Sequence, residues 1–298
     1  MDDATLAGLR TAASALFNVG LATMIGALAT AALLRDASSA WAAQRRRRCL
    51  RLFTLACSAK LLASLAWMEV QAIAITDLAP GGALLAASGV VIDTQFGRAS
   101  APGALALALG VALAATSRYR PPPLRWFAGV TAVAIVSHAC AGHAGANGFG
   151  WPVLVMSLHL LAIGAWSGAV FAAALTVLRA DVDAADALRY APRLSTLASV
   201  VLTGLLSAWH GLGGSLAPLL PATSTTWGVV LDVKLALIAV AVALGGFNRF
   251  IVLPALLATP GSPAPSRRFA GVLRLESMLL LAALAAAAML ANGEPPAV

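Results

Sequence analysis

Long runs of apolar residues alternate with short polar segments along this chain. A helix rises about 1.5 Å per residue, so about 20 apolar residues cross the roughly 30 Å of hydrocarbon in a bilayer. Eight runs reach that length, at residues 11–34, 51–77, 94–118, 124–143, 151–178, 191–213, 226–250 and 268–291. The pattern predicts an all-α, polytopic membrane protein with about eight transmembrane helices.

The composition agrees with a membrane location and excludes several other functions. Of the 298 residues, 60% are hydrophobic and 11% are charged, whereas a typical soluble domain has about 25% charged residues. The net charge is +8, but the arginines lie in short loops between apolar runs, so we expect no nucleic-acid partner. We find no phosphate-binding glycine loop or nucleophile elbow, and we expect a protein that is not an enzyme.

The distribution of basic residues predicts an orientation. If the eight runs cross the membrane in turn, sixteen of the twenty Lys and Arg residues fall on one side. By the positive-inside rule that side is cytoplasmic, and both termini face outward. We interpret the four arginines at residues 45–48 as a topology anchor that keeps this loop on the cytoplasmic side of the membrane lipids. The alternative is a binding site for anionic lipids.

Similar segments recur in the two halves of the chain. Residues 125–130 (RWFAGV) open the fourth run and residues 267–272 (RRFAGV) open the eighth, and they agree at five of six positions. Four runs per half start both copies on the same side of the membrane, so the repeat would be parallel. We predict two four-helix halves, residues 1–143 and 151–298, with Gly and Ala at close helix contacts. Chance similarity between Ala- and Leu-rich segments is the alternative.

All four histidines lie in the predicted outer half of the membrane: His138, His143, His159 and His210. Polar groups are costly in hydrocarbon and usually face the interior of a bundle. His159 follows Trp151 by eight residues, which places it about 12 Å below the outer boundary. The histidines therefore predict a polar layer in the outer half, although a hydrogen-bonded histidine between helices is the alternative for each.

The neighbours of these histidines favour copper. Imidazole binds several transition metals, whereas thiolate and thioether groups select Cu(I). Cys140 precedes His143 by three residues, and Met156 precedes His159 by three, so each pair would share a helix face. On an ideal helix His138 and His143 would point about 140° apart, and they could share an ion only if the helix loosens at the intervening glycine. The predicted copper site is His143, His159 and His210, assisted by His138, Cys140 and Met156.

Further polar residues within the spans are expected to support this site: Glu69, Asp232, Lys234, Asn248 and Glu276. Glu69 would either neutralise Lys234 at a matched depth, or orient a ligand histidine and accept a proton during metal release. The cytoplasmic half offers few soft ligands. The sequence therefore predicts one outer site and no ladder of ligands across the membrane.

Several segments resemble the CopD (PcoD-type) copper resistance membrane proteins of bacteria, over roughly residues 140–290. Residues 142–144 (GHA) resemble the family's Gly-His-Ala element, and residues 159–168 resemble its His-Leu-Leu and Trp-x-Gly signature. The elements between residues 214 and 254, including Lys234 and Asn248, resemble its long motif, and Glu276 lies where the family tends to have an acidic residue. The chain departs from the family at Val229, where the family usually has Arg.

The resemblance implies an inner-membrane protein that handles copper, as Cu(I) or Cu(II), together with a periplasmic CopC-like carrier, and that moves it inward. Both termini would then be periplasmic. One alternative is a haem-b-binding electron-transfer protein, because paired histidines from neighbouring helices also hold haem. Another is a non-transporting copper sensor or assembly factor. Copper binding should weaken below about pH 6, as histidine takes up protons.

Overall fold

The computed structural model describes residues 3–35, 39–76, 89, 91–116, 123–177, 184–211, 225–259 and 262–293. Its α-helices are α1 (Asp3–Leu33), α2 (Ala40–Thr76), α4 (Gln95–Thr116), α5 (Leu124–Ala141), α6 (Trp151–Ile163), α7 (Ala169–Ala172), α8 (Ala184–Gly211), α9 (Thr226–Phe247), α10 (Leu253–Ala258) and α11 (Pro263–Asn292). A 3₁₀ turn, η1 (His143–Gly145), follows α5, and the π-helical turns are η2 (Gly164–Gly168), η3 (Ala173–Val177) and η6 (Asn248–Val252). The described residues contain no strand, which confirms the all-α prediction.

Seven helical segments within the described residues are long and apolar enough to cross a membrane: Thr5–Leu33, Ala40–Ile73, Gln95–Thr116, Leu124–Ala141, Trp151–Val177, Thr226–Ala258 and Pro263–Asn292. They coincide with seven of the eight predicted runs. The remaining run, residues 191–213, falls mostly on α8, whose 28 residues would extend about 42 Å. The prediction of a polytopic helical membrane protein is confirmed.

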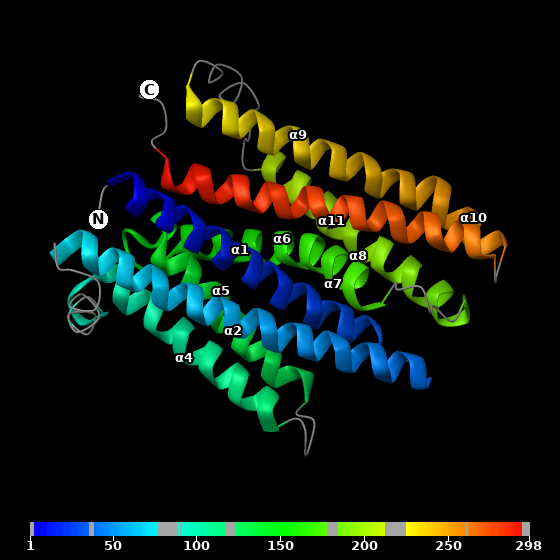
Figure 1. Ribbon diagram of the computed structural model, residues 1–298, viewed down its shortest axis with the longest axis horizontal. Coiled ribbons are helices and arrows are strands. Elements are labelled where there is room, and N and C mark those ends of the chain that lie inside the picture. Colours follow the sequence, from blue (N-terminus) through cyan, green and yellow to red (C-terminus); the bar gives the residue numbers. More distant parts are fainter. Residues whose placement is uncertain are drawn as a thin grey trace.

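The helices run up and down through one bundle (Figure 1). α1 lies in its middle and packs against α2, η2 and α11. α2, α4 and α5 form one side of the bundle, and α9 pairs with α11 on the other. The start of α1 and the end of α11 lie at the same end of the bundle, which we call the terminal end (Figure 1).

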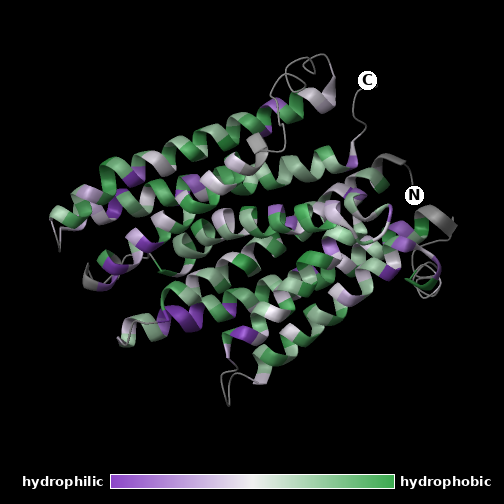
Figure 2. Ribbon diagram, turned by 180° about the vertical axis from the view of Figure 1, so that it is seen from behind, coloured by the Kyte–Doolittle hydropathy of each residue, from purple (hydrophilic) through white to green (hydrophobic). Residues whose placement is uncertain are grey.

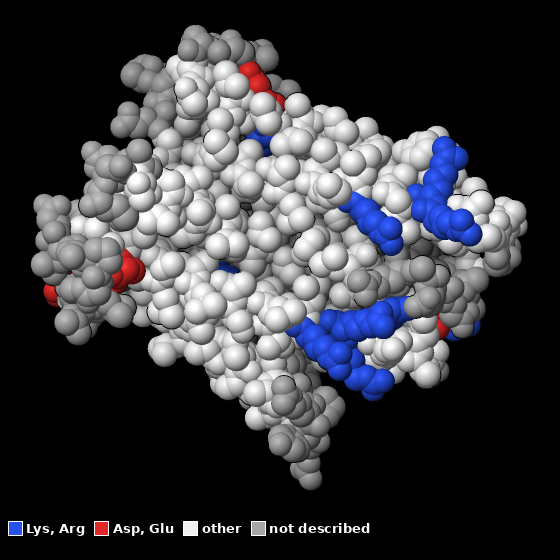
Figure 3. All heavy atoms as spheres, viewed as in Figure 1, with Lys and Arg blue, Asp and Glu red and all other residues white. Residues whose placement is uncertain are grey.

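Arginines gather at the opposite end, which we call the basic end. Figure 3 shows Lys and Arg concentrated there on the visible face. α2 and α11 both begin at this end (Figure 1). The first twelve residues of α2 include Arg47 and Arg51, and the first six residues of α11 include Arg267 and Arg268. The separation of the basic end from the terminal end is the arrangement on which the predicted orientation depends.

Apolar side chains cover the outside of the bundle. Leu105, Phe250 and Met278 are 72%, 75% and 67% exposed, and the outer helices are mostly hydrophobic along their length (Figure 2). Contiguous exposed apolar surface is typical of contact with lipid or with another protein. Together with the spans, this surface indicates that lipid surrounds the helices.

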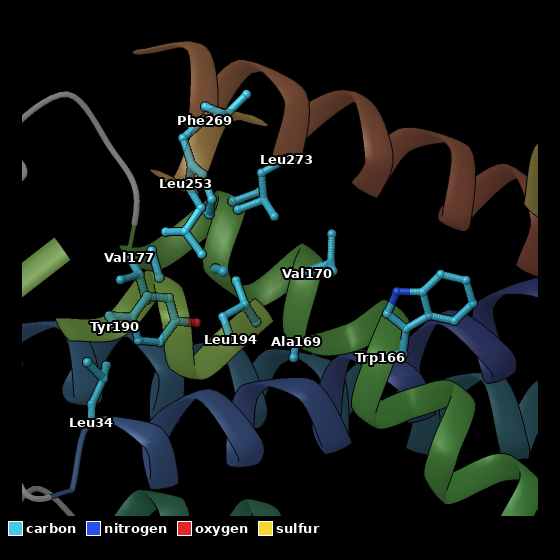
Figure 4. Packing of buried hydrophobic residues seen from close by; sticks show 14 of the residues in the cluster. Leu34, Trp166, Ala169, Val170, Val177, Tyr190, Leu194, Leu253, Phe269 and Leu273 are labelled. Atoms are coloured by element: carbon cyan, nitrogen blue, oxygen red, sulfur yellow. The ribbon is translucent and has the colours of Figure 1, made fainter. Parts of the chain in front are cut away.

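Two clusters of buried apolar residues fill the half of the bundle nearer the basic end. In the first, Val177, Leu253 and Phe269 surround Tyr190 of α8 (Figure 4). The hydroxyl of Tyr190 donates to the Thr30 hydroxyl over 3.5 Å, so the buried phenol keeps a hydrogen bond. This cluster joins α1 to the helices of the second half of the chain.

The second cluster joins α1, α2, α4 and α5. Phe53 and Phe127 meet edge to face at its centre, with ring centroids 5.2 Å apart, and Leu107 of α4 packs with them. All three side chains are at most 1% exposed. Aromatic pairs of this geometry add stability beyond their buried area.

α1 crosses η2 at very close range. A Cβ atom added to Gly168 would collide with the backbone of Ala22, and one added to Gly26 would collide with the backbone of Gly168. Small residues let helix backbones approach in membranes, where dispersion contacts replace the hydrophobic effect as the driving force. The expected contact through Gly and Ala is therefore present between α1 and the second half of the chain. The division at residues 143 and 151 stays a prediction.

Candidate metal centre

A cavity of about 1010 Å³ lies in the half of the bundle nearer the terminal end. Its walls come from the first part of α1, the last part of α2, the start of α4, the end of α5, α6, and the end of α11. Each of these stretches lies toward the terminal end (Figure 1). The cavity thus occupies the half of the bundle that the sequence predicts to be the outer one.

Four of the six predicted copper ligands line this cavity. His138 comes from α5, His143 from η1, and Met156 and His159 from α6. His143, Met156 and His159 are exposed and His138 is half-buried. The structure therefore brings three histidines and a methionine from consecutive segments to the wall of one space.

These histidines do not form a ready-made cage. Among the described residues, no three His, Cys, Asp or Glu side chains lie close enough together to hold a metal ion. The side chain of His210, the fourth histidine, lies outside the described residues. Coordination of one ion by several of these histidines would require their side chains to converge from the cavity wall.

The end of α5 determines where His143 points. The helix ends at Ala141, and Gly142 adopts an extended conformation with φ −92° and ψ −172°. This break is the condition under which His138 and His143 could share an ion. It releases His143 from the direction it would have on a continuous helix, and both His138 and His143 then line the cavity.

The same break separates His143 from Cys140. The two residues do not share a helix face, because α5 ends between them, and Cys140 is half-buried and absent from the described cavity wall. Hydrogen bonds within the turn after Gly142 and one from another helix fix its position. The Gln95 side-chain amide of α4, itself on the cavity wall, donates to the carbonyl oxygen of Gly145.

His138 is fixed by stacking. The Phe17 ring of α1 lies against its imidazole, with ring centroids 4.5 Å apart and an angle of 26° between the planes. The Lys60 ammonium of α2 lies 2.8 Å from the centroid of the same Phe17 ring. Lys60 and Phe17 are not among the site residues predicted from the sequence. A lysine inside an apolar span is the signal that could have singled out this group.

The π-helical turn η2 joins the cavity to the helix crossing. Such turns are frequent at functional sites. Trp166 lines the cavity, and its indole N–H donates to the carboxylate of Glu276 in α11. Glu276 is 3% exposed, so this predicted supporting residue positions a wall residue and does not line the cavity itself.

The other predicted supporting residues fall into two groups. Lys234 of α9 lines the cavity. Glu69 and Asp232 are half-buried and Asn248 is buried, and none of these three is among the described residues of the wall. The Asn248 amide donates to the carbonyl oxygen of Phe269 over 3.5 Å, which ties η6 to α11. Roles for Glu69, Asp232 and Asn248 in metal handling stay predictions.

Membrane-spanning helices around a cavity with histidines on its wall define a polytopic membrane protein with an internal site in one half of the bundle. Residues 1–152 match the family described as copper resistance protein D-like, N-terminal domain, and residues 193–290 match the family described as copper resistance protein D. The chain belongs to the copper resistance protein D family, as the motifs predict. No curated protein and no solved structure was found to match it.

Proposed function

We propose that this protein binds copper in the outer half of the bacterial inner membrane and passes it toward the cytoplasm, without enzymatic chemistry. Membership of a copper resistance family supports copper as the cargo. One structural observation supports the site. His138, His143, His159 and Met156 line a single cavity in the half of the bundle opposite the basic end.

The donor set suits copper in either oxidation state. Neutral imidazole nitrogen binds both ions, and the thioether of Met156 favours Cu(I). The ligands lie on two helices and the turn between them, so the ion would draw α5, η1 and α6 together. A site that closes around its ion can also open to release it, which a transporter requires.

The terminal end is the side on which copper would arrive. By the positive-inside rule the arginine-rich end is cytoplasmic, which makes the terminal end periplasmic. His143 lies in the short turn after α5, at that end, and is exposed. Among the histidines whose side chains are described, it is the first that a periplasmic carrier of the CopC type would meet.

The packing of the half of the bundle nearer the basic end affects whether copper can cross the membrane. The buried clusters around Phe53 and Tyr190 fill the described part of the bundle toward the basic end. Copper would have to pass between α1 and the second half of the chain, and these packed helices would have to shift. The same packing favours a second candidate function, a copper sensor or assembly factor that does not transport.

Copper binding by the purified full-length protein tests the site. Elemental analysis after dialysis should find copper bound to the wild type and lost from H143A and H159A. M156A should weaken binding, whereas M278A should not, because Met278 is exposed on α11 away from the cavity. Full copper in H143A and H159A would refute the site, and a Soret band would indicate haem.

Copper uptake into proteoliposomes separates the two candidate functions. Transport predicts uptake that requires His143 and His159. Tight binding to the wild type without any uptake would refute transport and leave the sensor or assembly role.

A further inference from the structure

The cavity wall carries positive charge that copper binding does not explain. Arg10 of α1, Lys60 of α2 and Lys234 of α9 all line it, and no Asp or Glu is among the described residues of the wall. Neutral side chains that can donate hydrogen bonds line the same cavity: Ser14, Asn18, Ser64, Gln71, Gln95 and Ser100. Basic groups and neutral donors without carboxylates suit an anion.

Lys60 is the most constrained of the three cations. It is 1% exposed, and among the described residues its ammonium has no hydrogen-bond acceptor. α2 approaches α1 closely here, since a Cβ added to Gly20 would lie 3.0 Å from the Cβ of Lys60. A buried ammonium carries three N–H donors, and leaving all of them without acceptors is costly.

A second buried cation of the same helix provides a comparison. Arg45 is 2% exposed, and it donates to the backbone carbonyl oxygen of Thr176 over 3.4 Å. Arg10 on the cavity wall also has a partner, the side-chain oxygen of Gln71 at 3.5 Å. The Lys60 ammonium lies over the face of the Phe17 ring, and Lys60 lines the cavity. A cation–π contact leaves the N–H donors of the ammonium without acceptors.

We propose that this cavity binds a small monovalent anion, a halide or a small carboxylate, held by the Lys60 ammonium with Lys234 and Arg10 adding positive potential. The anion would accept the hydrogen bonds that Lys60 cannot make within the described protein. Anion binding of this kind does not require copper. A further consequence rests on the proposed function: the anion would offset the repulsion that a copper cation meets beside these basic groups.

Chloride binding to the copper-free, full-length protein in detergent tests this proposal. Equilibrium dialysis against radioactive chloride in gluconate buffer should show saturable binding of about one ion per chain. K60M should weaken that binding at least about tenfold, the worth of one charge-assisted hydrogen bond. K60R should retain it. R47M, which removes an exposed arginine near the basic end, is the matched control and should bind as the wild type does.

Acetate identifies which anion is preferred. Acetate that displaces chloride in the micromolar to millimolar range would assign the site to carboxylates, and acetate without effect would assign it to halides. A wild type that binds neither anion saturably would overturn the proposal. So would K60M with unchanged affinity. If K60M does not fold, the wild-type titration and K60R decide.

Copper measured in the same preparations keeps this inference separate from the proposed function. Saturable chloride binding without any copper binding would count against the copper site alone. Copper binding that is equal in chloride, acetate and gluconate, in a protein that binds no anion, would overturn the anion site alone.

Discussion

The two halves of this bundle are built from the same helices and differ in what those helices bury. α1 contributes Phe17 to the cavity half and Met24 to a packed cluster. α5 contributes His138 to the cavity and Phe127 to the same cluster. Along both α1 and α5, the inward-facing side chains thus change from lining the cavity to packing in a buried cluster. One half of the bundle can therefore bind a ligand while the other stabilises the fold.

The contrast gives substitutions in the two halves different expected effects. A change in the packed half should reduce stability while any folded protein still binds copper. A change on the cavity wall should reduce binding while the protein stays folded. The predictions below test that separation, beginning with the largest effect.

The crossing of α1 and η2 should be the most sensitive position. G168A places a Cβ against the backbone of Ala22, which cannot move aside as a flexible side chain would. We expect little folded protein by size-exclusion chromatography in detergent. G129A is the matched control, because a Cβ at Gly129 meets nothing within 4 Å, and it should fold normally. Normal folding of G168A would show that this crossing is not needed to hold α1 against the second half of the chain.

Removing an aromatic ring should have the next largest effect, and the loss of stability should differ between the packed half and the cavity half. F127A empties a fully buried position beside Phe53 and should cost about 3–5 kcal/mol of stability. F96A removes a ring from the cavity wall, where it is half-buried, and should cost less. Thermal unfolding in detergent measures both. An equal loss in the two variants would contradict the assignment of stability to the packed half.

Acid should release copper without unfolding the protein. Copper binds neutral imidazole and competes with protons for its nitrogen, so the affinity should fall with falling pH. A copper titration at several pH values measures this effect, with size-exclusion chromatography as the control for folding. Affinity that does not change with pH would argue against histidine ligands.

Ser137 should give the smallest effect. Its hydroxyl donates to the carbonyl oxygen of Ala99 over 2.5 Å and accepts from the N–H of Gly103 over 3.1 Å, and it so bridges one turn of α4. S137A should cost only about 1 kcal/mol, because α4 can restore a direct bond. S157A, whose hydroxyl has no hydrogen-bond partner among the described residues, should have no effect on thermal unfolding.

Much of the fold follows from the sequence. Apolar run length and arginine position are one-dimensional properties, and they predict the helices and the separation of the basic end from the terminal end. The sequence also shows that His138 and His143, five residues apart, could share a site only if the helix breaks at Gly142, and the structure has that break. Depth along a helix is likewise readable, so His138, His143 and His159 could be placed in the outer half of the membrane.

The sequence does not reveal which way a side chain points around the bundle. Cys140, Glu69 and Asp232 have a suitable depth but are absent from the described cavity wall. Lys60 lines the cavity because α2 packs closely on α1 near Gly20, a contact between segments 40 residues apart. Rotation and neighbours depend on packing between distant segments, which no local pattern encodes.

Anomalous diffraction from copper-soaked crystals of the full-length protein tests the central claim most directly. We predict one copper peak within the cavity, next to His143 and His159 and in the half of the bundle opposite the basic end. A copper peak only at Cys49 or Cys57, in the packed half, would contradict the account, as would no peak in protein that retains an intact cavity.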